Sequence, residues 1–325
     1  MRAAAIVAHG GLDQLKLLDW PEPQAGTGQA VVAVKACGLN YLDIFVRRGM
    51  PGLPVTMPRI PGGDIAGVVS AVGPGVDRAW IGKRVLVDPH LTGGGALGEH
   101  ANGGLCERIA VEAAKLIEMP AAVGFDAAAA LPIAFGTARK MIERGRLKAG
   151  ELVLVLGASG GVGTGCVQIA ARLGAVVIAC ASSPDKLARL KALGAQHLID
   201  YTTEDFSAAA WRISGKKGVD VCVNFTGGDT WVPSIRALAL NGRLLTCGAT
   251  AGYDPKEDIR YIWRREVSII GSNGWRREDL EALLLETAAG RFDPCVDRVF
   301  PLEQAVEAMR TIEERRVFGK VIVRP

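Results

Sequence analysis

The feature that most constrains this chain is a glycine-rich turn directly after a short apolar segment. Residues 151–156 predict a buried strand, and they run into Gly157-Ala-Ser-Gly-Gly-Val-Gly163, after which an apolar helical face continues to Leu173. Glycines in a strand–turn–helix unit permit a tight turn, close approach of backbone to a pyrophosphate, and close packing of helix on strand. We therefore predict a dinucleotide-binding turn that includes Gly160, Gly161, Val162 and Gly163.

The stretch after this turn indicates which nucleotide binds. An NAD site usually places Asp or Glu about 20 residues further on, where it holds the ribose hydroxyls. No carboxylate occurs from Thr164 to Pro184; Ser182, Ser183 and Lys186 instead offer hydroxyls and an ammonium. These groups suit a 2′-phosphate, so the pattern favours NADPH. The alternative is that Lys186 is a solvated helix residue and Ser183 a helix cap.

The rhythm of apolar residues changes along the chain. Up to about residue 120, short apolar runs at 30–35, 65–72 and 83–87 predict a β-rich lobe. Beyond it, strands and helices alternate, which predicts a doubly wound parallel sheet. The strands are expected at 151–156, 175–180, 197–200, 219–225, 242–247 and 267–271, with helices at 161–173, 184–193 and 232–239. Helices at 280–289 and 302–315 and a strand at 320–324 end the chain, and periodicity leaves open which lobe they join.

Composition excludes several classes of protein. The 325 residues allow two lobes, and the net charge of 38 − 34 = +4 is scattered, so we predict no nucleic-acid partner. No apolar run of about 18 residues and no secretory signal core occur, so we predict a cytoplasmic protein with no membrane partner. The seven cysteines show no C-x-x-C spacing, which argues against a disulfide framework or a zinc knuckle.

Five motifs together resemble the medium-chain dehydrogenase/reductase superfamily, and within it the zinc-independent quinone oxidoreductase branch. The resemblance covers nearly the whole chain. The motifs are Cys37-Gly-Leu-Asn40-Tyr-Leu-Asp43, Pro61-Gly-Gly-Asp64-Ile-Ala-Gly67, the glycine turn, Ala192-Leu-Gly-Ala195 with Asp200-Tyr201, and Phe318-Gly-Lys-Val-Ile-Val323.

The resemblance implies an α/β fold with two domains. A GroES-like β-rich catalytic domain would span 1–122 and be completed by 274–325, and a doubly wound Rossmann domain would span 123–273, with the cofactor in the cleft. It also implies a homodimer joined through the sixth strand, 267–271. Carried over by position, the 2′-phosphate contacts fall on Ser182, Lys186 and Tyr201, a nicotinamide-side threonine on Thr137, and an active-site polar pair on Asn40 and Asp43.

Zinc-dependent members of the superfamily hold a catalytic metal with three side chains. Here Cys37 stands at the first of these positions, but Gly63 stands at the second and Ile133 at the third, so we predict no metal. The cysteine-rich loop for structural zinc is also absent. His90, Glu99 and His100 could still form an improvised site with Cys37, and that alternative stays open.

Without zinc, a substrate carbonyl must be polarised by hydrogen bonds while NADPH delivers hydride. We therefore predict an NADPH-dependent reductase. Its substrate would be a small molecule, either a quinone or an α,β-unsaturated carbonyl. In this reductase Asn40 donates to the carbonyl oxygen, Asp43 organises that neighbourhood, and Arg47 or Arg48 anchors an acidic substrate.

Other interpretations of these residues stay open at this point. Asn40 and Asp43 could serve the local backbone or a neighbouring arginine, and Cys37 could be a nucleophile, a vestigial ligand or a buried filler. Phe45 and Pro51 replace tyrosines that quinone reductases often carry. Their loss favours a non-catalytic NADPH-binding protein of the crystallin or sensor kind as the alternative function, and a zinc-dependent alcohol dehydrogenase is the third.

Overall fold

The computed structural model describes residues 1–325 and divides into two compact units. Unit 1 contains residues 1–133 and 280–325, and unit 2 contains residues 134–279. The two ends of the chain therefore belong to one unit. The boundaries between the units lie later in the chain than the predicted domain boundaries at 122 and 273.

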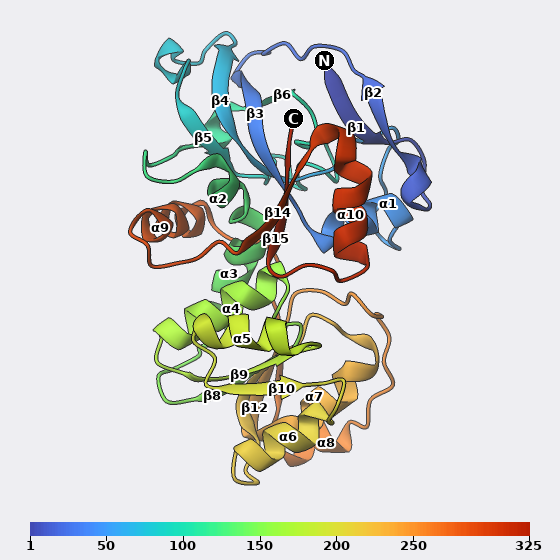
Figure 1. The fold of residues 1–325 in the computed structure, drawn as a ribbon, viewed down its shortest axis with the longest axis vertical. Helices are drawn as coiled ribbons and strands as arrows, with labels where there is room; N and C mark the ends of the chain where they lie inside the picture. The colour runs from blue at the N-terminus through green and yellow to red at the C-terminus, as the bar shows by residue number, and fades with distance from the viewer. The chain divides into compact units, whose positions relative to one another are not determined.

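Unit 1 is built on a seven-stranded sheet in which both ends of the chain take part. Its longest strand, β3 (Gln29–Leu39), pairs antiparallel with β4 (Asp64–Val72), with β6 (Arg108–Glu112) and with β15 (Lys320–Arg324). Figure 1 shows the red β15 beside the blue β3. The remaining strands are β5 (Arg84–Val87), β7 (Leu116–Glu118) and β14 (Val296–Pro301), and β1 (Arg2–Ile6) with β2 (Leu15–Asp19) forms a separate pair.

The register of these strands determines which side chains meet. Val321 of β15 stands opposite Leu39 of β3, and Asp64 of β4 stands opposite Gly38. The beginning of β15, the end of β3 and the beginning of β4 therefore meet at one place. Three segments from distant parts of the sequence are brought together there by strand pairing alone.

The helices of unit 1 pack around this sheet. α1 (Tyr41–Arg48) begins directly after β3, and α10 (Ala305–Glu313) contacts both α1 and β15. α2 (Phe125–Ala129) lies against β3 and β4. Glycine is required at position 38, because a Cβ there would lie 2.1 Å from the carbonyl oxygen of Ala129. The hydrophobic core includes Ile44 and Met309, so both ends of the chain contribute to it.

Unit 2 contains a six-stranded parallel sheet in the order β10-β9-β8-β11-β12-β13. The chain thus runs outward from the centre in one direction and then in the other, which is the doubly wound order. In Figure 1, α4 and α5 cover one face of this sheet and α6, α7 and α8 the other. The strands are β8 (Leu152–Val155), β9 (Val176–Ala181), β10 (His197–Asp200), β11 (Val219–Val223), β12 (Leu238–Thr246) and β13 (Ser268–Gly271). The helices are α3 (Thr137–Arg144), α4 (Gly161–Arg172), α5 (Pro184–Ala192), α6 (Phe206–Ile213), α7 (Trp231–Ala237) and α8 (Arg260–Arg264), and α9 (Arg277–Ala288) begins in this unit.

The predicted fold class is confirmed, with local differences. The six predicted strands of the parallel sheet are present, and the terminal segment joins unit 1 through β15. The pattern of apolar residues did not reveal the eight-residue helix α6 or the strand β14. It also placed the start of β12 at residue 242, whereas Leu238 already pairs with Val219 of β11. No helix of this structure is both long and apolar enough to cross a membrane.

Candidate functional site

The glycine turn of unit 2 has the geometry that the sequence predicted for it. Gly157 follows β8 with a φ of +60°, a conformation that favours glycine, and Gly160 is the N-cap of α4. A Cβ at Gly163 would lie 2.3 Å from the carbonyl oxygen of Gly157. At Gly160, by contrast, the nearest atom would be 3.5 Å away. The first N–H groups of a helix have no partner within it, so the start of α4 can bind an anion.

Ser182 and Tyr201 lie side by side at the edge of the sheet that carries the glycine turn. Ser182 follows β9 and Tyr201 follows β10, and Asp200 stands opposite Ala181 in the register of these two strands. The N–H of Tyr201 donates to the carbonyl oxygen of Ala181 at 3.2 Å. The Tyr201 side chain is 43% exposed, and Ser182 is half-buried. Both residues are therefore at least partly exposed at this edge of the sheet.

Lys186 and Thr137 complete the predicted cofactor residues, and both lie in first helical turns. The N–H of Lys186 donates to Ser183 Oγ at 3.4 Å, so Ser183 is the N-cap of α5. Thr137 begins α3 and is 8% exposed. The next residue, Ala138, packs against α4, where a Cβ at Gly165 would lie 3.0 Å from Ala138 Cβ. Close contact between α3 and α4 thus holds Thr137 beside the helix that follows the glycine turn.

Sequence reasoning missed Asn224, which organises the loop at the end of β11. Its side chain is fully buried, and its Oδ1 accepts from the N–H groups of Thr226 and Gly227 at 2.9 and 3.0 Å. Its Nδ2 donates to the hydroxyls of Thr230 and Ser234 at 3.0 and 2.9 Å. β11 is the neighbour of β8, where the winding of the sheet reverses, and ligands bind at such a point. The polar residue that ends the apolar run 219–223 was the available signal.

Unit 1 contains a second group of interest, the polar cluster of Asn40, Asp43, Asp64 and Lys320. Asp64 is fully buried and Lys320 is 2% exposed; Asp64 Oδ2 lies 2.9 Å from Lys320 Nζ. Asn40 Nδ2 donates to the same carboxylate oxygen at 2.8 Å, and the N–H of Ile133 donates to Asp64 Oδ1 at 2.8 Å. Both carboxylate oxygens are therefore satisfied by donors of this unit. A buried charge pair requires such additional hydrogen bonds.

Asp43, the fourth residue of the polar cluster, accepts hydrogen bonds from backbone N–H groups. Its Oδ2 accepts from the N–H of Asn40 and its Oδ1 from the N–H of Gly62, both at 2.8 Å. Burial raises the pKa of Asp43 to about 6, although the two N–H groups favour the charged form. Asp43 thereby ties the start of α1 to the segment before β4. The proposed pairing with an arginine does not occur, since Arg47 binds Glu313 and the carbonyl oxygen of Gly10.

Comparison with known proteins points to one family for both units. Residues 26–121 match the family model described as alcohol dehydrogenase GroES-like domain, and residues 161–289 match the one described as zinc-binding dehydrogenase. The synaptic vesicle membrane protein VAT-1 homolog of Rattus norvegicus is 32% identical over 100% of this chain and 84% of that protein. A solved structure of an NAD-dependent alcohol dehydrogenase is 38% identical, with 100% of both chains covered and a TM-score of 0.93. The quinone oxidoreductase-like protein 2 of Bos taurus is 29% identical over 90% of this chain and 84% of that one. This chain belongs to the medium-chain dehydrogenase/reductase superfamily.

Of the three positions at which zinc-dependent members of the superfamily carry metal ligands, only that of Cys37 holds a side chain able to bind a metal, since Gly63 and Ile133 fill the other two. Cys37 is fully buried, and burial raises the pKa of its thiol well above the ordinary value. A Cβ at Gly62 would lie 2.5 Å from Cys37 Sγ, and a Cβ at Gly63 would lie 2.9 Å from Ile133 Cδ1. A histidine at position 63 would therefore need its neighbours to move. The enclosed thiol fits the interpretation of Cys37 as a buried filler.

The improvised zinc site has no counterpart in the structure. His90 Nδ1 lies 3.2 Å from Asp88 Oδ1, and His100 Nδ1 lies 3.7 Å from Glu99. No group of three or more His, Cys, Asp or Glu side chains is arranged to hold a metal ion. The His90, Glu99, His100 and Cys37 set therefore does not gather into one site.

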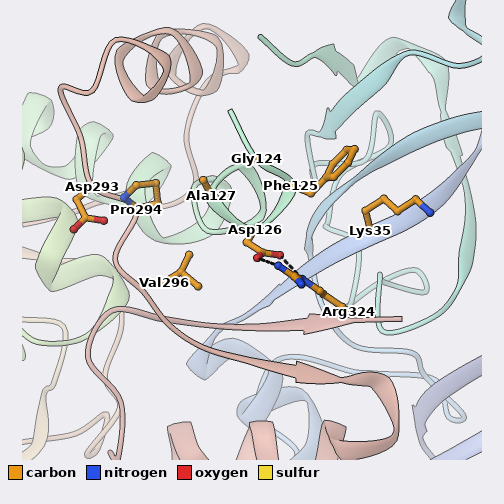
Figure 2. A pocket seen from close by; sticks show the side chains of 9 residues that line it. All are labelled: Lys35, Gly124, Phe125, Asp126, Ala127, Asp293, Pro294, Val296 and Arg324. Atoms are coloured by element: carbon orange, nitrogen blue, oxygen red, sulfur yellow. Dashed lines mark hydrogen bonds and ion pairs between the residues drawn. The ribbon is translucent and has the colours of Figure 1, made fainter. Parts of the chain in front are cut away.

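Two further features of unit 1 are the arginines predicted to anchor an acidic substrate and a hollow in the surface. Arg47 is 1% exposed and held by Glu313, so its guanidinium is not open to an acidic substrate; Arg48 also pairs with Glu313 but is 52% exposed. Unit 1 also contains a hollow of about 600 Å³. Figure 2 shows the Asp126–Arg324 ion pair among the side chains that line it. None of the predicted catalytic or cofactor residues lines this hollow.

Proposed function

We propose that this member of the superfamily is an NADPH-dependent, zinc-independent reductase that transfers hydride to a quinone or an α,β-unsaturated carbonyl. The observation that carries the proposal is the state of Asp64 and its neighbours. The carboxylate is neutralised by Lys320 and bonded by Asn40, and Gly63 offers no side chain. The polar cluster is thus equipped to donate a hydrogen bond to an oxygen, and it is poorly equipped to ligate a cation.

NADPH fits the carboxyl edge of the parallel sheet. A Cβ at Gly160 would contact only the carbonyl oxygen of Gly157, at 3.5 Å, so a phosphate oxygen could approach the backbone at the start of α4. The hydroxyls of Ser182 and Tyr201, with Lys186 in the first turn of α5, would hold the 2′-phosphate, and Thr137 would contact the nicotinamide side. No carboxylate between Thr164 and Pro184 would repel that phosphate. When bound, NADPH supplies the hydride.

The residues of the chain would orient and polarise the substrate. A carboxamide N–H of Asn40 would donate to the carbonyl oxygen and stabilise the negative charge that develops there as hydride arrives. Asp43 would hold Asn40 by its backbone N–H, and it would not touch the substrate. Phe45 has no hydroxyl, so the final proton would come from water.

The same experiment also tests two alternatives: the use of NADH, and cofactor binding without turnover. The similar structure of an NAD-dependent alcohol dehydrogenase favours NADH as a competitor for the site. The loss of tyrosines at Phe45 and Pro51 favours binding without turnover. We also propose a homodimer joined through β13, because β13 ends the sheet order and Ile269 is 44% exposed. A cytoplasmic location is likewise a proposal.

The test is the consumption of NADPH, followed by absorbance at 340 nm, with a panel of quinones and enones. We expect turnover with at least one class, and a kcat/KM at least about tenfold higher with NADPH than with NADH, as a 2′-phosphate site predicts. Binding of NADPH without turnover across the panel would refute the reductase. A preference for NADH would refute the assignment of Ser182, Lys186 and Tyr201 while leaving the reaction intact.

A further inference from the structure

Lys320 is a buried ammonium whose three N–H groups are all used. Its Nζ donates to the carbonyl oxygen of Leu39 at 2.9 Å, to Asn40 Oδ1 at 2.6 Å and to Asp64 Oδ2 at 2.9 Å. A lysine is rarely buried unless its charge is paired and its donors are satisfied, and both conditions hold here. The ammonium therefore has no donor left for a substrate. Whatever Lys320 contributes to a reaction must pass through the groups that it holds.

The carboxamide of Asn40 is held in one orientation by its two charged neighbours. An ammonium can only donate and a carboxylate can only accept, so the atom beside Lys320 is the oxygen and the atom beside Asp64 is the nitrogen. The flipped amide would place NH2 against the ammonium and oxygen against the carboxylate. Opposite charges on the two sides of one amide thus exclude the rotamer that sequence alone would allow.

This orientation leaves one hydrogen-bond donor without a partner. The Nδ2 group has two N–H bonds, of which one points to Asp64 Oδ2 at 2.8 Å. The second N–H meets no acceptor in the chain, and Asn40 is only half-buried. The second N–H is therefore the donor of this amide that remains for a ligand. Because the oxygen of the same amide binds an ammonium, electron density is drawn from the nitrogen and the second N–H becomes a stronger donor.

We propose that Lys320 is the positioning residue of the carbonyl-binding site, which it completes by fixing and polarising the Asn40 carboxamide toward the oxygen of a quinone or enone. The inference rests on the proposed function. In this inference, the ammonium of Lys320 polarises the substrate carbonyl through the Asn40 amide, whereas a metal ion would polarise it directly. The strand register explains how residue 320 comes to act here, because Val321 opposite Leu39 places Lys320 beside Asn40.

The test compares two Met substitutions on one strand. Lys320→Met removes the buried ammonium, and Arg324→Met removes an exposed cation, with a side chain 58% exposed, from the far end of β15. We expect Lys320→Met to lower kcat about 100-fold, the usual cost of a lost transition-state donor, with the dissociation constant of NADPH changed less than about threefold. Arg324→Met should leave both values unchanged. Thermal unfolding of each variant checks that the protein is folded.

A double-mutant cycle separates positioning from stability. If Lys320 acts through Asn40, then Lys320→Met added to Asn40→Ala lowers kcat no further than Asn40→Ala alone. If the fold-decrease in kcat of the double variant equals the product of the decreases in the two single variants, the inference is overturned. A kcat of Lys320→Met close to that of the wild type would also overturn it. If Lys320→Met does not fold, Lys320→Gln replaces it, since it removes the ammonium and keeps a polar group at the end of the side chain. A kcat of Lys320→Gln close to that of the wild type overturns the inference, and a loss that is absent when Asn40→Ala is already present supports it.

The wild type distinguishes the two proposals. A wild-type protein that reduces no member of the panel overturns the proposed function and this inference together. An active wild type with an unaffected Lys320→Met variant overturns this inference alone.

Discussion

The glycine turn of unit 2 and the polar cluster of unit 1 form their surfaces by different means. In the turn, glycines leave the backbone uncovered. Gly163 is required by the packing of the chain itself, since a Cβ there would lie 2.3 Å from a backbone oxygen, and Gly160 leaves the start of α4 without a side chain where we propose that a phosphate binds. In the polar cluster, the buried Lys320 of β15 and Asp64 of β4 bond to each other and to the half-buried Asn40, the N-cap of α1, and one N–H of Asn40 has no partner in the chain. The glycine turn, which is one local segment, therefore depends on its backbone conformation. The polar cluster, which joins three segments, depends on the pairing of its buried charges.

The largest effect should come from Gly163→Ala. Its Cβ would lie 2.3 Å from Gly157 O and 2.6 Å from Ala158 Cα, which are backbone atoms that cannot move aside. We expect the free energy of unfolding to fall by about 3 kcal/mol or more, measured by urea denaturation. Gly160→Ala is the matched control, because its Cβ meets only Gly157 O at 3.5 Å.

Gly160→Ala should fold normally and yet bind NADPH at least about tenfold more weakly, since its methyl group occupies the approach of the phosphate. This pair of variants distinguishes a glycine required by the fold from one required by the ligand. Normal NADPH binding by Gly160→Ala would break the comparison, because the turn would then not be the binding surface.

A smaller effect concerns the charge balance of the polar cluster. Burial raises the pKa of Asp43 from 3.8 to about 6, so its contribution to stability is fully present below about pH 4 and is lost as the pH rises through about 6. Relative to Asp43→Asn, the wild type should lose up to about 3 kcal/mol of unfolding free energy between about pH 4 and about pH 7. Urea denaturation at several pH values measures this. A difference that stays constant, or that grows in favour of the wild type, contradicts the assignment.

The smallest effect should come from Arg324→Ala. Arg324 ends the strand that Lys320 begins, and it pairs with Asp126 where its side chain is 58% exposed. Exposed pairs of this kind are worth less than about 1 kcal/mol and weaken with salt. If the unfolding free energy fell by more than this and the loss did not depend on salt, then Arg324 would interact electrostatically with the polar cluster, which contradicts the contrast drawn here.

The same contrast explains what the sequence could predict. The turn was predictable because its glycines stand within one segment whose strand and helix are also local, and the six-stranded sheet followed from the apolar runs around it. The N-cap at Ser183 was likewise visible as a local pattern. Each of these features depends on neighbours along the chain.

The polar cluster was predicted only in part. Asn40 and Asp43 stood out within one motif, but their partners did not. Lys320 contacts Asn40 and Asp64 because β15 pairs with β3 in one antiparallel register. The sequence of residues 318–323 does not predict that register. Asn224 escaped for a related reason, because the hydrogen bonds of a buried loop depend on backbone positions that apolar periodicity does not encode. The roles assigned to Asn40, Asp43 and the cofactor residues stay predictions.

The central claim of the proposed function is that a hydrogen-bond donor replaces a metal at the site of reduction. Its most direct test is turnover of NADPH with an accepted quinone or enone, before and after treatment with a strong chelator, with metal content measured on the same samples. We predict an unchanged rate and far less than one zinc per chain. A rate that falls with the chelator and returns on addition of zinc would contradict the account.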